Sequence, residues 1–403
     1  MVEKSTLKID PSGKDMLNFI QMICDKVGPR IGGSEEESKA GDMIFDTMAS
    51  FCDNVEKSEF ECHPGGFLDW IWITTVLYIA GVISYFFIPV LSSILIFLGI
   101  AVFFFQQILL MEVVDFLFPK KKSFHVIGKI NPQNTPKKLV LLAGHHDSAY
   151  EFPLLSKLGG KSAYLIMLVF IIALFNIILG IVKTIFMITG AIPQGYIALL
   201  DIFQYILFVI GVIVILIVAK FLRSNTVVMG ANDNLSAVAA VIECGKYFAK
   251  NKTDETELWI VSFAGEEHMR GSKRFVSKYK QELTEREAML FNLECLSADI
   301  FLLATAETMY LAKHSNRVID FVKKAAEDLK ISIKIGPLKF AGSDAANFSR
   351  KGLHATTLFG LGKKGTPPDW HTKNDVAERL SGEKIAKAAE IALHFVELVD
   401  RSE

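Results

Sequence analysis

Length, composition and charge exclude several classes of protein. The chain has 403 residues, of which 51% are hydrophobic and 31 are phenylalanine, and its mean hydropathy of +0.35 is high for a water-soluble enzyme. A formal net charge of −1 gives no global basic field, so nucleic acid is not an expected partner. The five cysteines are scattered without C-x-x-C spacing, which predicts neither a disulfide framework nor a zinc ribbon and fits a reducing compartment. The polar start of the chain, MVEKSTLKIDPSGKD, lacks the apolar core of a signal peptide.

The apolar residues are concentrated in segments long enough to cross a membrane, which takes about 20 residues as a helix. These segments are 70–87, 90–111, 163 to about 182, and about 196 to 219. Only Ile88 and Pro89 separate the first two, and a loop with Gly190, Pro193 and Gly195 separates the second two. We therefore predict two transmembrane helical hairpins, and hence four transmembrane helices.

The flanking charges predict the orientation of these hairpins. Two hairpins return the chain to its starting side, so all polar segments share one side of the membrane. Basic residues flank the hairpins on that side, namely Lys120, Lys121, Lys122, Lys157, Lys161, Lys220 and Arg223. The other side has only Lys183, so the positive-inside rule predicts a multi-pass protein whose polar part is cytoplasmic. Asp201 lies about a turn inside the fourth segment, where it is either an interfacial or a functional group.

The polar segments 1–67, 119–162 and 223–403 predict one domain that the hairpins 68–118 and 163–222 interrupt. Short apolar runs typical of buried strands alternate with helical periodicity at 235–249 and 385–399. The runs are 139–143, 258–264, 289–293 and 354–359. This alternation predicts an α/β sandwich with a mostly parallel sheet, in which ligands bind at the carboxyl ends of the strands.

Residues of metal-ligand type follow these runs. His145, His146 and Asp147 follow the first run, and a Glu pair, Glu266 and Glu267, follows the second. Three further candidates are Glu294 after the third run, Asp233 before the helix at 235, and His371 in the loop PPDW-His. Each alone is more typical of a helix cap or a surface charge. Together they supply imidazoles and carboxylates that suit zinc, and a bridging carboxylate with one His and one acid per ion would build a two-metal site.

The motifs that carry these residues resemble a known family. GHHDS, GANDNLSA, FAGEEHMRGS, NLE, GSDAANFSRKGL and WHTKND stand in the order found in the co-catalytic di-zinc exopeptidases. That family includes bacterial leucine aminopeptidases, glutamate carboxypeptidase and the glutaminyl cyclases, and VGPRIGGSEEE resembles its N-terminal segment. The resemblance covers nearly all of the chain outside the hairpins. It implies the three-layer α/β sandwich of zinc-dependent exopeptidases.

The resemblance also implies a set of ligands for two zinc ions per chain, although cobalt or manganese could replace zinc. Asp233 is similar to the carboxylate that bridges both ions. His145 and Glu294 would complete one site, and Glu267 and His371 would complete the other.

Three more roles follow from the same resemblance. Glu266 is similar to the general base, and Asp147 to the partner that orients a ligating histidine. Asp344 resembles a second-shell or substrate-side acid, although a helix N-cap is an equal alternative. Trp370 would lie on the substrate side, where many family members have a tyrosine that stabilises the tetrahedral intermediate.

These expectations favour a zinc aminopeptidase that hydrolyses peptides from the N-terminus. The Trp-His-Thr sequence is also similar to the glutaminyl cyclases, which use one zinc, so a glutaminyl-peptide cyclotransferase is the first alternative. The bridging turn Asp233-Asn234-Leu235-Ser236 has the peptidase form and favours the peptidase. An inactive receptor or scaffold is the alternative of another class, whereas a transporter would need more polar residues in the spans. Oligomeric state stays open, including a homo-oligomer.

The second hairpin fills the interval between His145 and Asp233, two residues expected to bind the same ions. Its ends should therefore leave and rejoin the fold beside the active site. The hairpins would then either gate access of membrane-delivered peptides or simply anchor the enzyme in the lipid bilayer.

Overall fold

The computed structural model describes residues 11–190, 194–363 and 365–402. Outside them lie the first ten residues, part of the segment predicted to lack a signal peptide, and Pro193, part of the loop predicted in the second hairpin. The chain forms two compact units. The sheet unit comprises Met1–Pro64, Lys120–Ala149 and Val227–Glu403. The helical unit comprises Gly65–Pro119 and Tyr150–Thr226, and it includes residues 150–162 because α5 packs on α6 and α7.

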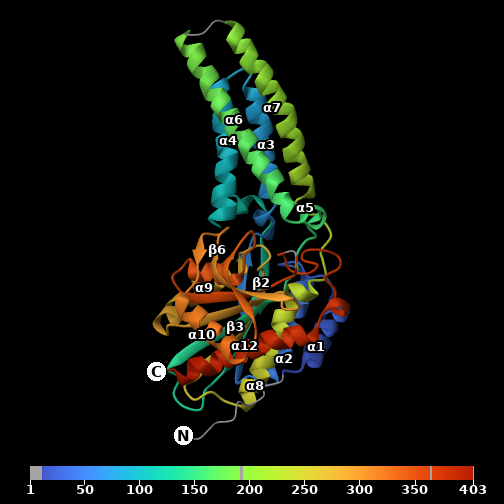
Figure 1. Ribbon diagram of the computed structural model, residues 1–403, viewed down its shortest axis with the longest axis vertical. Helices are drawn as coiled ribbons and strands as arrows, with labels where there is room; N and C mark the ends of the chain where they lie inside the picture. Colours follow the sequence, from blue (N-terminus) through green and yellow to red (C-terminus); the bar gives the residue numbers. More distant parts are fainter. Residues whose placement is uncertain (1–10, 191–193, 364, 403) are drawn as a thin grey trace. The chain divides into compact units, whose positions relative to one another are not determined.

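The sheet unit is built on one mixed sheet in the order β1-β2-β4-β3-β5-β9-β6-β7, with β8 paired to β6 (Figure 1). Its strands are β1 (Asn54–Cys62), β2 (Lys121–Ile130), β3 (Lys138–His145), β4 (Thr256–Phe263), β5 (Met289–Glu294), β6 (Ile300–Glu307), β7 (Ala312–Lys313), β8 (Ile333–Leu338) and β9 (His354–Leu361). The four predicted strands β4, β3, β5 and β9 run parallel. The pairs β1–β2, β2–β4, β6–β9 and β6–β7 are antiparallel, so the prediction of a mostly parallel sheet is not confirmed. The four predicted runs are those of strands buried on both faces, a position typical of parallel strands.

Helices cover both faces of this sheet, which gives the three layers expected. One face carries α1 (Gly13–Lys26), α2 (Glu35–Ala49), α8 (Ser236–Lys250), α10 (Asn316–Asp328) and α12 (Gly382–Arg401). The other face carries α9 (Gly271–Glu285) and α11 (Asp344–Ser349). Side chains of β3 alternate between the two cores, because successive residues of a strand point to opposite faces. Val140 and Leu142 pack with the first set of helices, and Leu139, Leu141 and Ala143 with the second.

The helical unit is a bundle in which α3, α4, α6 and α7 pack in a ring. Its elements are α3 (Trp70–Ser84), α4 (Pro89–Phe103) continued by a π-helical turn (Phe104–Ile108), α5 (Pro153–Leu158), α6 (Ser162–Thr189) and α7 (Gln194–Phe221). Among the described residues, three helices are long and apolar enough to cross a membrane: Pro89–Ile108, Ser162–Thr189 and Gly195–Phe221. α3 is as apolar but has 15 residues, which is short for a span. Gly190 ends α6 in a left-handed conformation, and Gly195 lies within α7 rather than in a loop.

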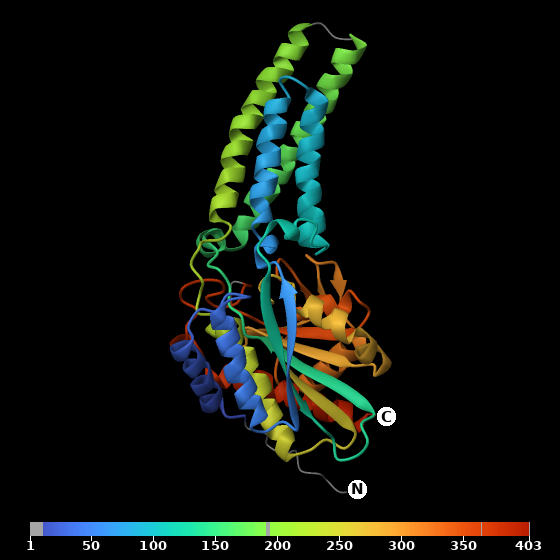
Figure 2. The ribbon, with the colours of Figure 1, turned by 180° about the vertical axis from the view of Figure 1, so that it is seen from behind.

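Each of the two parts of the helical unit is flanked by residues that are paired with each other in space. The first part replaces the loop of a β-hairpin, because Cys62 at the end of β1 pairs with Lys121 at the start of β2. Figure 2 shows these two strands side by side. The second part replaces the connection between β3 and α8. There the N–H of Val228 donates to the carbonyl of Ala149 (2.9 Å), and the N–H of Glu151 to that of Thr226 (2.8 Å).

The bundle interior contains more polar side chains than the sequence suggested. α6 continues seven residues beyond 182, so Lys183 lies inside the helix rather than beyond the membrane span. Its Nζ lies 2.7 Å from Oδ1 of Asp201, so this acid is paired. About two turns earlier on α6, buried Asn176 donates to the hydroxyl of Tyr78 (2.9 Å) and accepts from Gln204 (2.6 Å). Polar residues inside a membrane bundle usually hold helices together or mark a function.

Candidate metal centre

The candidate ligands come from distant parts of the sequence and meet at one edge of the sheet. His145 is the last residue of β3, and Glu294 is the last residue of β5. Glu266 and Glu267 lie in the turn between β4 and α9. Since β4, β3 and β5 are parallel neighbours, their carboxyl ends lie together, as expected for ligand sites in such sheets.

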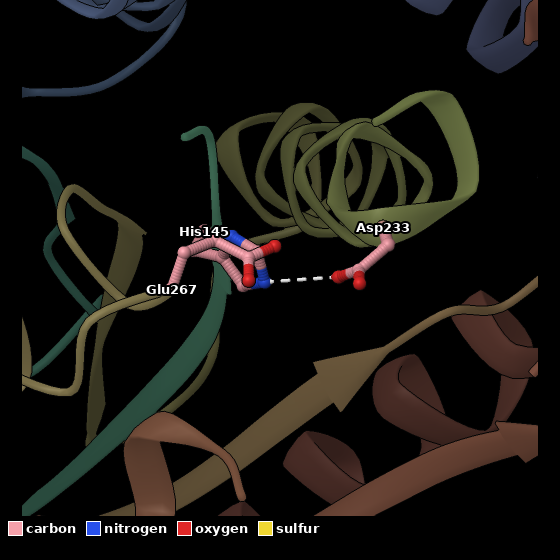
Figure 3. Close-up of side chains that lie close together, drawn as sticks. All are labelled: His145, Asp233 and Glu267. Atoms are coloured by element: carbon pink, nitrogen blue, oxygen red, sulfur yellow. Dashed lines mark ion pairs between the residues drawn. The ribbon is translucent and has the colours of Figure 1, made fainter. Parts of the chain in front are cut away.

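Asp233 lies at the centre of the group. It belongs to an irregular turn (Ala231–Leu235) before α8, and the peptide bond to Asn234 is cis. Its Oδ1 lies 3.2 Å from Nε2 of His145, a pair shown in Figure 3, and its Oδ2 lies 3.1 Å from Nε2 of His371. The two oxygens of this carboxylate therefore face different imidazoles, which is the arrangement that a bridge between two ions requires.

The other carboxylates divide between the two imidazoles. Oε2 of Glu294 lies 3.4 Å from Nε2 of His145, and Oε2 of Glu267 lies 3.3 Å from Nε2 of His371. Two sets of three ligand atoms lie within 4.8 Å of one another: those of His145, Asp233 and Glu267, and those of Asp233, Glu294 and Cys295. The first set takes one residue from each predicted pair, and Cys295 was not predicted as a ligand. The structure thus brings the five predicted ligands together around Asp233; their binding of metal stays a prediction.

The electrostatics of the group favour bound cations. Burial raises the pKa of Glu294 to about 7, and attraction by His145 offsets only part of this effect. Burial, reinforced by the neighbouring carboxylates, raises the pKa values of Glu266 and Glu267 well above their usual range. Within the described residues, Oε1 of Glu267 is buried without a hydrogen-bond partner. Buried carboxylates without compensation are costly, and imidazoles with carboxylates are ligands of zinc, so these residues fit a pair of divalent cations.

Asp147 supports both the histidine and the Glu pair. Its Oδ1 accepts a hydrogen bond from the N–H of Glu266 (3.1 Å), and its Oδ2 from that of Glu267 (3.0 Å). Its Oδ1 also lies 3.4 Å from Nδ1 of His145, and its carbonyl oxygen lies 3.1 Å from the same nitrogen. A partner on Nδ1 leaves Nε2 of His145 free to bind a metal, which is the orienting role predicted for Asp147.

Two residues that sequence reasoning missed hold Asp233 and Glu294. Asp375 is buried and accepts hydrogen bonds from the N–H groups of Asn232 (2.6 Å) and Asp233 (3.1 Å). Asn234 donates from Nδ2 to Oε2 of Glu294 (2.5 Å). The only sequence signal for these residues was their place in the family motifs, since Asp375 is the last residue of WHTKND and Asn234 belongs to GANDNLSA.

Arg30 and Glu37 tie the N-terminal segment to the same loops. The fully buried guanidinium of Arg30 donates to the carbonyl oxygens of His146 (2.5 Å), Met229 (2.6 Å) and Gly230 (2.7 Å). It therefore bridges the turn after His145 and the turn before Asp233. Glu37 accepts from the N–H of Gly265 (3.0 Å), in the turn that carries the Glu pair.

The two remaining predicted residues lie in nearby loops. Trp370 lies beside His371 with the rings tilted and their centroids 4.5 Å apart, and it contacts Phe359 edge-on. Asp344 is the first residue of α11 and is completely buried, whereas the N-cap position belongs to Ser343. The N-cap alternative for Asp344 is therefore wrong. Burial raises the pKa of Asp344 well above its usual range, and the charge of Glu294 adds to this.

Comparisons with known proteins give a family match, a curated relative and several similar folds. The model for peptidase family M28 matches residues 214–396, a segment that holds all the candidate ligands except His145. The chain is 25% identical over 173 residues to aminopeptidase YwaD of Bacillus subtilis, a match that covers 40% of this chain and 36% of that relative. This chain thus spans little more than a third of the curated relative that it matches.

Three solved structures have a similar fold. A zinc aminopeptidase from Bacillus subtilis is 14% identical, with a TM-score of 0.57 and coverage of 98% of this chain and 97% of that one. A zinc-dependent exopeptidase from Parabacteroides distasonis is 15% identical (0.57; 98% and 99%), and a glutaminyl cyclase from an Acidobacteriales bacterium is 12% identical (0.58; 97% and 96%). At these identities the likeness concerns the fold alone. With the family match, it confirms the resemblance to zinc exopeptidases and supports the prediction of a metalloexopeptidase.

Proposed function

We propose that this chain, which carries the M28 peptidase match, is a membrane-bound zinc aminopeptidase that hydrolyses peptides from their N-terminus. The observation that carries the proposal is the position of Asp233, whose oxygens face the Nε2 atoms of His145 and His371 at 3.2 and 3.1 Å. A structural ion pair would need one imidazole. A carboxylate shared by two imidazoles, each with its own further acid, is the donor set of a two-metal hydrolase.

Two zinc ions would be held by these residues. One ion would take His145 and Glu294, the other Glu267 and His371, and Asp233 would bind both. When bound, such a pair activates water, polarises the scissile carbonyl and can hold the free α-amine of a peptide.

Glu266 would serve as the general base. Its Oε2 lies 3.6 Å from Nε2 of His145, farther than the nearest oxygens of the proposed ligands. The carboxylate would therefore lie near the metal centre without acting as a ligand. The hydrogen bonds from the Glu266 and Glu267 N–H groups to Asp147 fix its backbone. This carboxylate would accept the proton of the attacking water and deliver it to the leaving amine. Asp344 and Trp370 would line the substrate side.

The helical unit would provide the membrane attachment, as two hairpins with four transmembrane helices. Three helices meet the length and hydropathy of a span. For α3, the apolar sequence continues through Phe87, and a short span is accommodated by local thinning of the bilayer. The catalytic residues would face the cytoplasm, as the lysines at the hairpin ends predict. Labelling of an Ile88→Cys variant at the turn of the first hairpin tests this, because a membrane-impermeant maleimide should reach it only from the outer side of intact cells.

Replacement of the general base tests the mechanism. We expect bound zinc near two per chain in wild type and in Glu266→Gln, with hydrolysis of aminoacyl amides lowered by about 10²- to 10⁴-fold in the variant. Glu287→Gln is a matched control, because Glu287 is exposed and paired with Arg317 (2.7 Å). Full activity of Glu266→Gln would contradict the assigned mechanism.

A glutaminyl-peptide cyclotransferase is the second candidate, supported by the similar fold of glutaminyl cyclases and by Trp370 beside His371. A peptide with N-terminal glutamine separates the two reactions, since a cyclase releases ammonia and a peptidase releases glutamine. An inactive receptor or scaffold would release neither. The filled ligand set speaks against this alternative.

A further inference from the structure

The helical unit has an open cavity at the end where α6 begins and α7 ends. Its volume is ≈ 390 Å³, and its lining includes Glu151, Ser156, Lys157, Lys220, Phe221 and Ser224. These residues belong to α5, the last residues of α7 and the adjoining connections. The lining residues belong to the helical unit, whereas the candidate metal ligands belong to the sheet unit.

Two ammonium groups gather in this cavity without an acidic partner. Nζ of Lys157 lies 5.8 Å and Nζ of Lys220 lies 5.7 Å from the centroid of the same Phe221 ring. Across the residues that the structure covers, neither lysine forms an ion pair. Both lysines are exposed and would attract an anion that enters the cavity.

Two other cations of this unit, unlike these lysines, have an acidic partner. Arg223 binds Oδ1 of Asp69 from Nε (2.8 Å), and Lys183 binds Asp201 (2.7 Å). The cavity lining itself offers one acid, Glu151, whose Oε2 accepts a hydrogen bond from the hydroxyl of Ser224 (3.3 Å). Two ammonium groups against one carboxylate leave the cavity with an excess of positive charge.

Apolar side chains continue from the cavity along α7. Phe221 in the cavity lining is 37% exposed, and Leu158 on α5 is 41% exposed. Leu216 and Ile217, about one turn before Phe221 on α7, are similarly exposed. A ligand of this surface would need an anionic group for the lysines and hydroxyls, and hydrocarbon for the helix. A phosphate ester with long acyl chains has both.

We propose that this cavity binds the head group of an anionic phospholipid. Its phosphate would lie between Lys157 and Lys220, with the Ser156 hydroxyl as a further donor, and its acyl chains would follow the exposed side of α7. Basic cavities at the cytoplasmic ends of transmembrane helices are typical sites for such lipids. The proposal rests on the membrane location proposed above, but not on peptidase activity.

Native mass spectrometry of the full chain, released from nanodiscs of equal parts phosphatidylglycerol and phosphatidylcholine, tests the proposal. We expect wild type to retain phosphatidylglycerol preferentially, and Lys157→Gln with Lys220→Gln to lower this retention by roughly tenfold or more, because each lysine near an anionic head group contributes about fivefold. Lys161→Gln is the matched control, since Lys161 lies at the same end of the bundle but does not line the cavity. Each variant should keep the wild-type thermal unfolding and hydrolytic activity.

Several results would overturn the proposal. One is equal retention of both lipids by wild type, and another is a loss in Lys161→Gln as large as in the double variant. Displacement of the lipid by millimolar inorganic phosphate would mean that the cavity takes free phosphate instead. Alkaline carbonate extraction tests the membrane location separately from the lipid site. A chain that is extracted refutes the membrane location, whereas a chain that stays in the membrane without lipid preference refutes the lipid site alone.

Discussion

Asp375 provides a sharp test of how the centre is held, because it touches the backbone of Asp233 and not a candidate metal position. Asp375→Ala removes the acceptor of two buried N–H groups, those of Asn232 and Asp233. Each buried donor left without a partner costs about 1–3 kcal/mol, so the free energy of unfolding should fall by about 2–6 kcal/mol. The same bonds fix the residue that faces both imidazoles. Loss of such an indirect partner typically lowers metal affinity or activity by about 10- to 100-fold.

The assay combines thermal unfolding, zinc affinity from competition with a chelator, and kcat and KM for an aminoacyl amide. Asp375→Asn keeps one acceptor oxygen and should recover part of both losses. Asp299→Ala is the control, because Asp299 is an exposed acid bonded to Lys384 (2.7 Å). If Asp375→Ala unfolds more easily but binds zinc and turns over substrate as wild type does, Asp375 supports the fold only, and the reasoning is refuted.

Three further predictions follow from the contacts described. Arg30→Met should lower the free energy of unfolding of the sheet unit by roughly 2–5 kcal/mol in urea, because three carbonyls, two of them buried, lose their charged donor; an unchanged midpoint would contradict this. Lys183→Met should destabilise the bundle in detergent by about 1–2 kcal/mol, and adding Asp201→Leu should restore it, since the double variant leaves no unpaired charge. Removal of metal by a chelator should lower the unfolding temperature, because zinc at about 100 times its Kd stabilises the folded state by about 2.7 kcal/mol per site; the same temperature with and without zinc would mean that the centre binds no metal.

The strands that the sequence identified are those whose environment is uniform. β3 reads LVLLA because helices cover both of its faces, and such a run is apolar at every position. β1 reads NVEKSEFEC and lies at the edge of the sheet, so polar residues interrupt its pattern. β8 reads IKIGPL, in which glycine and proline conceal the strand. The antiparallel pairs β1–β2 and β2–β4 were missed because polar residues interrupt β1 and β2. β6 reads IFLLATAE, and nothing in this pattern indicates that it pairs antiparallel with β9.

The candidate site shows a similar division. Metal ligands must be His or an acid in a known order, so motif order alone could predict the five that the structure brings together. Arg30 and Asp375 act through hydrogen bonds to distant backbone groups and Asn234 through one to the Glu294 carboxylate, and no residue type indicates which distant group a side chain will reach. Lys183 was misplaced for a related reason. A lysine ends an apolar run in the sequence, whereas in the bundle Asp201 compensates its charge and the helix continues past it.

The course of the chain makes the relation between membrane and catalysis testable. The second part of the helical unit leaves after Ala149 and returns at Val227, close in sequence to Asp147 and Asp233. Because the N–H of Val228 bonds to the carbonyl of Ala149, these two residues lie close enough for a two-residue Asn-Gly turn to join them. Excision of residues 150–227 with such a turn should leave the sheet unit folded, with its contacts from Arg30 to the turns at His146 and Gly230 in place.

Comparison of this variant with the full chain distinguishes a gate from an anchor. If the hairpin only anchors the enzyme, the variant should bind zinc and hydrolyse a panel of soluble aminoacyl amides with unchanged kcat/KM. If the hairpin admits apolar peptides, kcat/KM for the apolar members should fall while that for the polar members stays, because the substrate path and not the centre has changed. A uniform loss across the panel, with zinc still bound, would contradict both, and would mean that the hairpin holds the catalytic loops themselves in place.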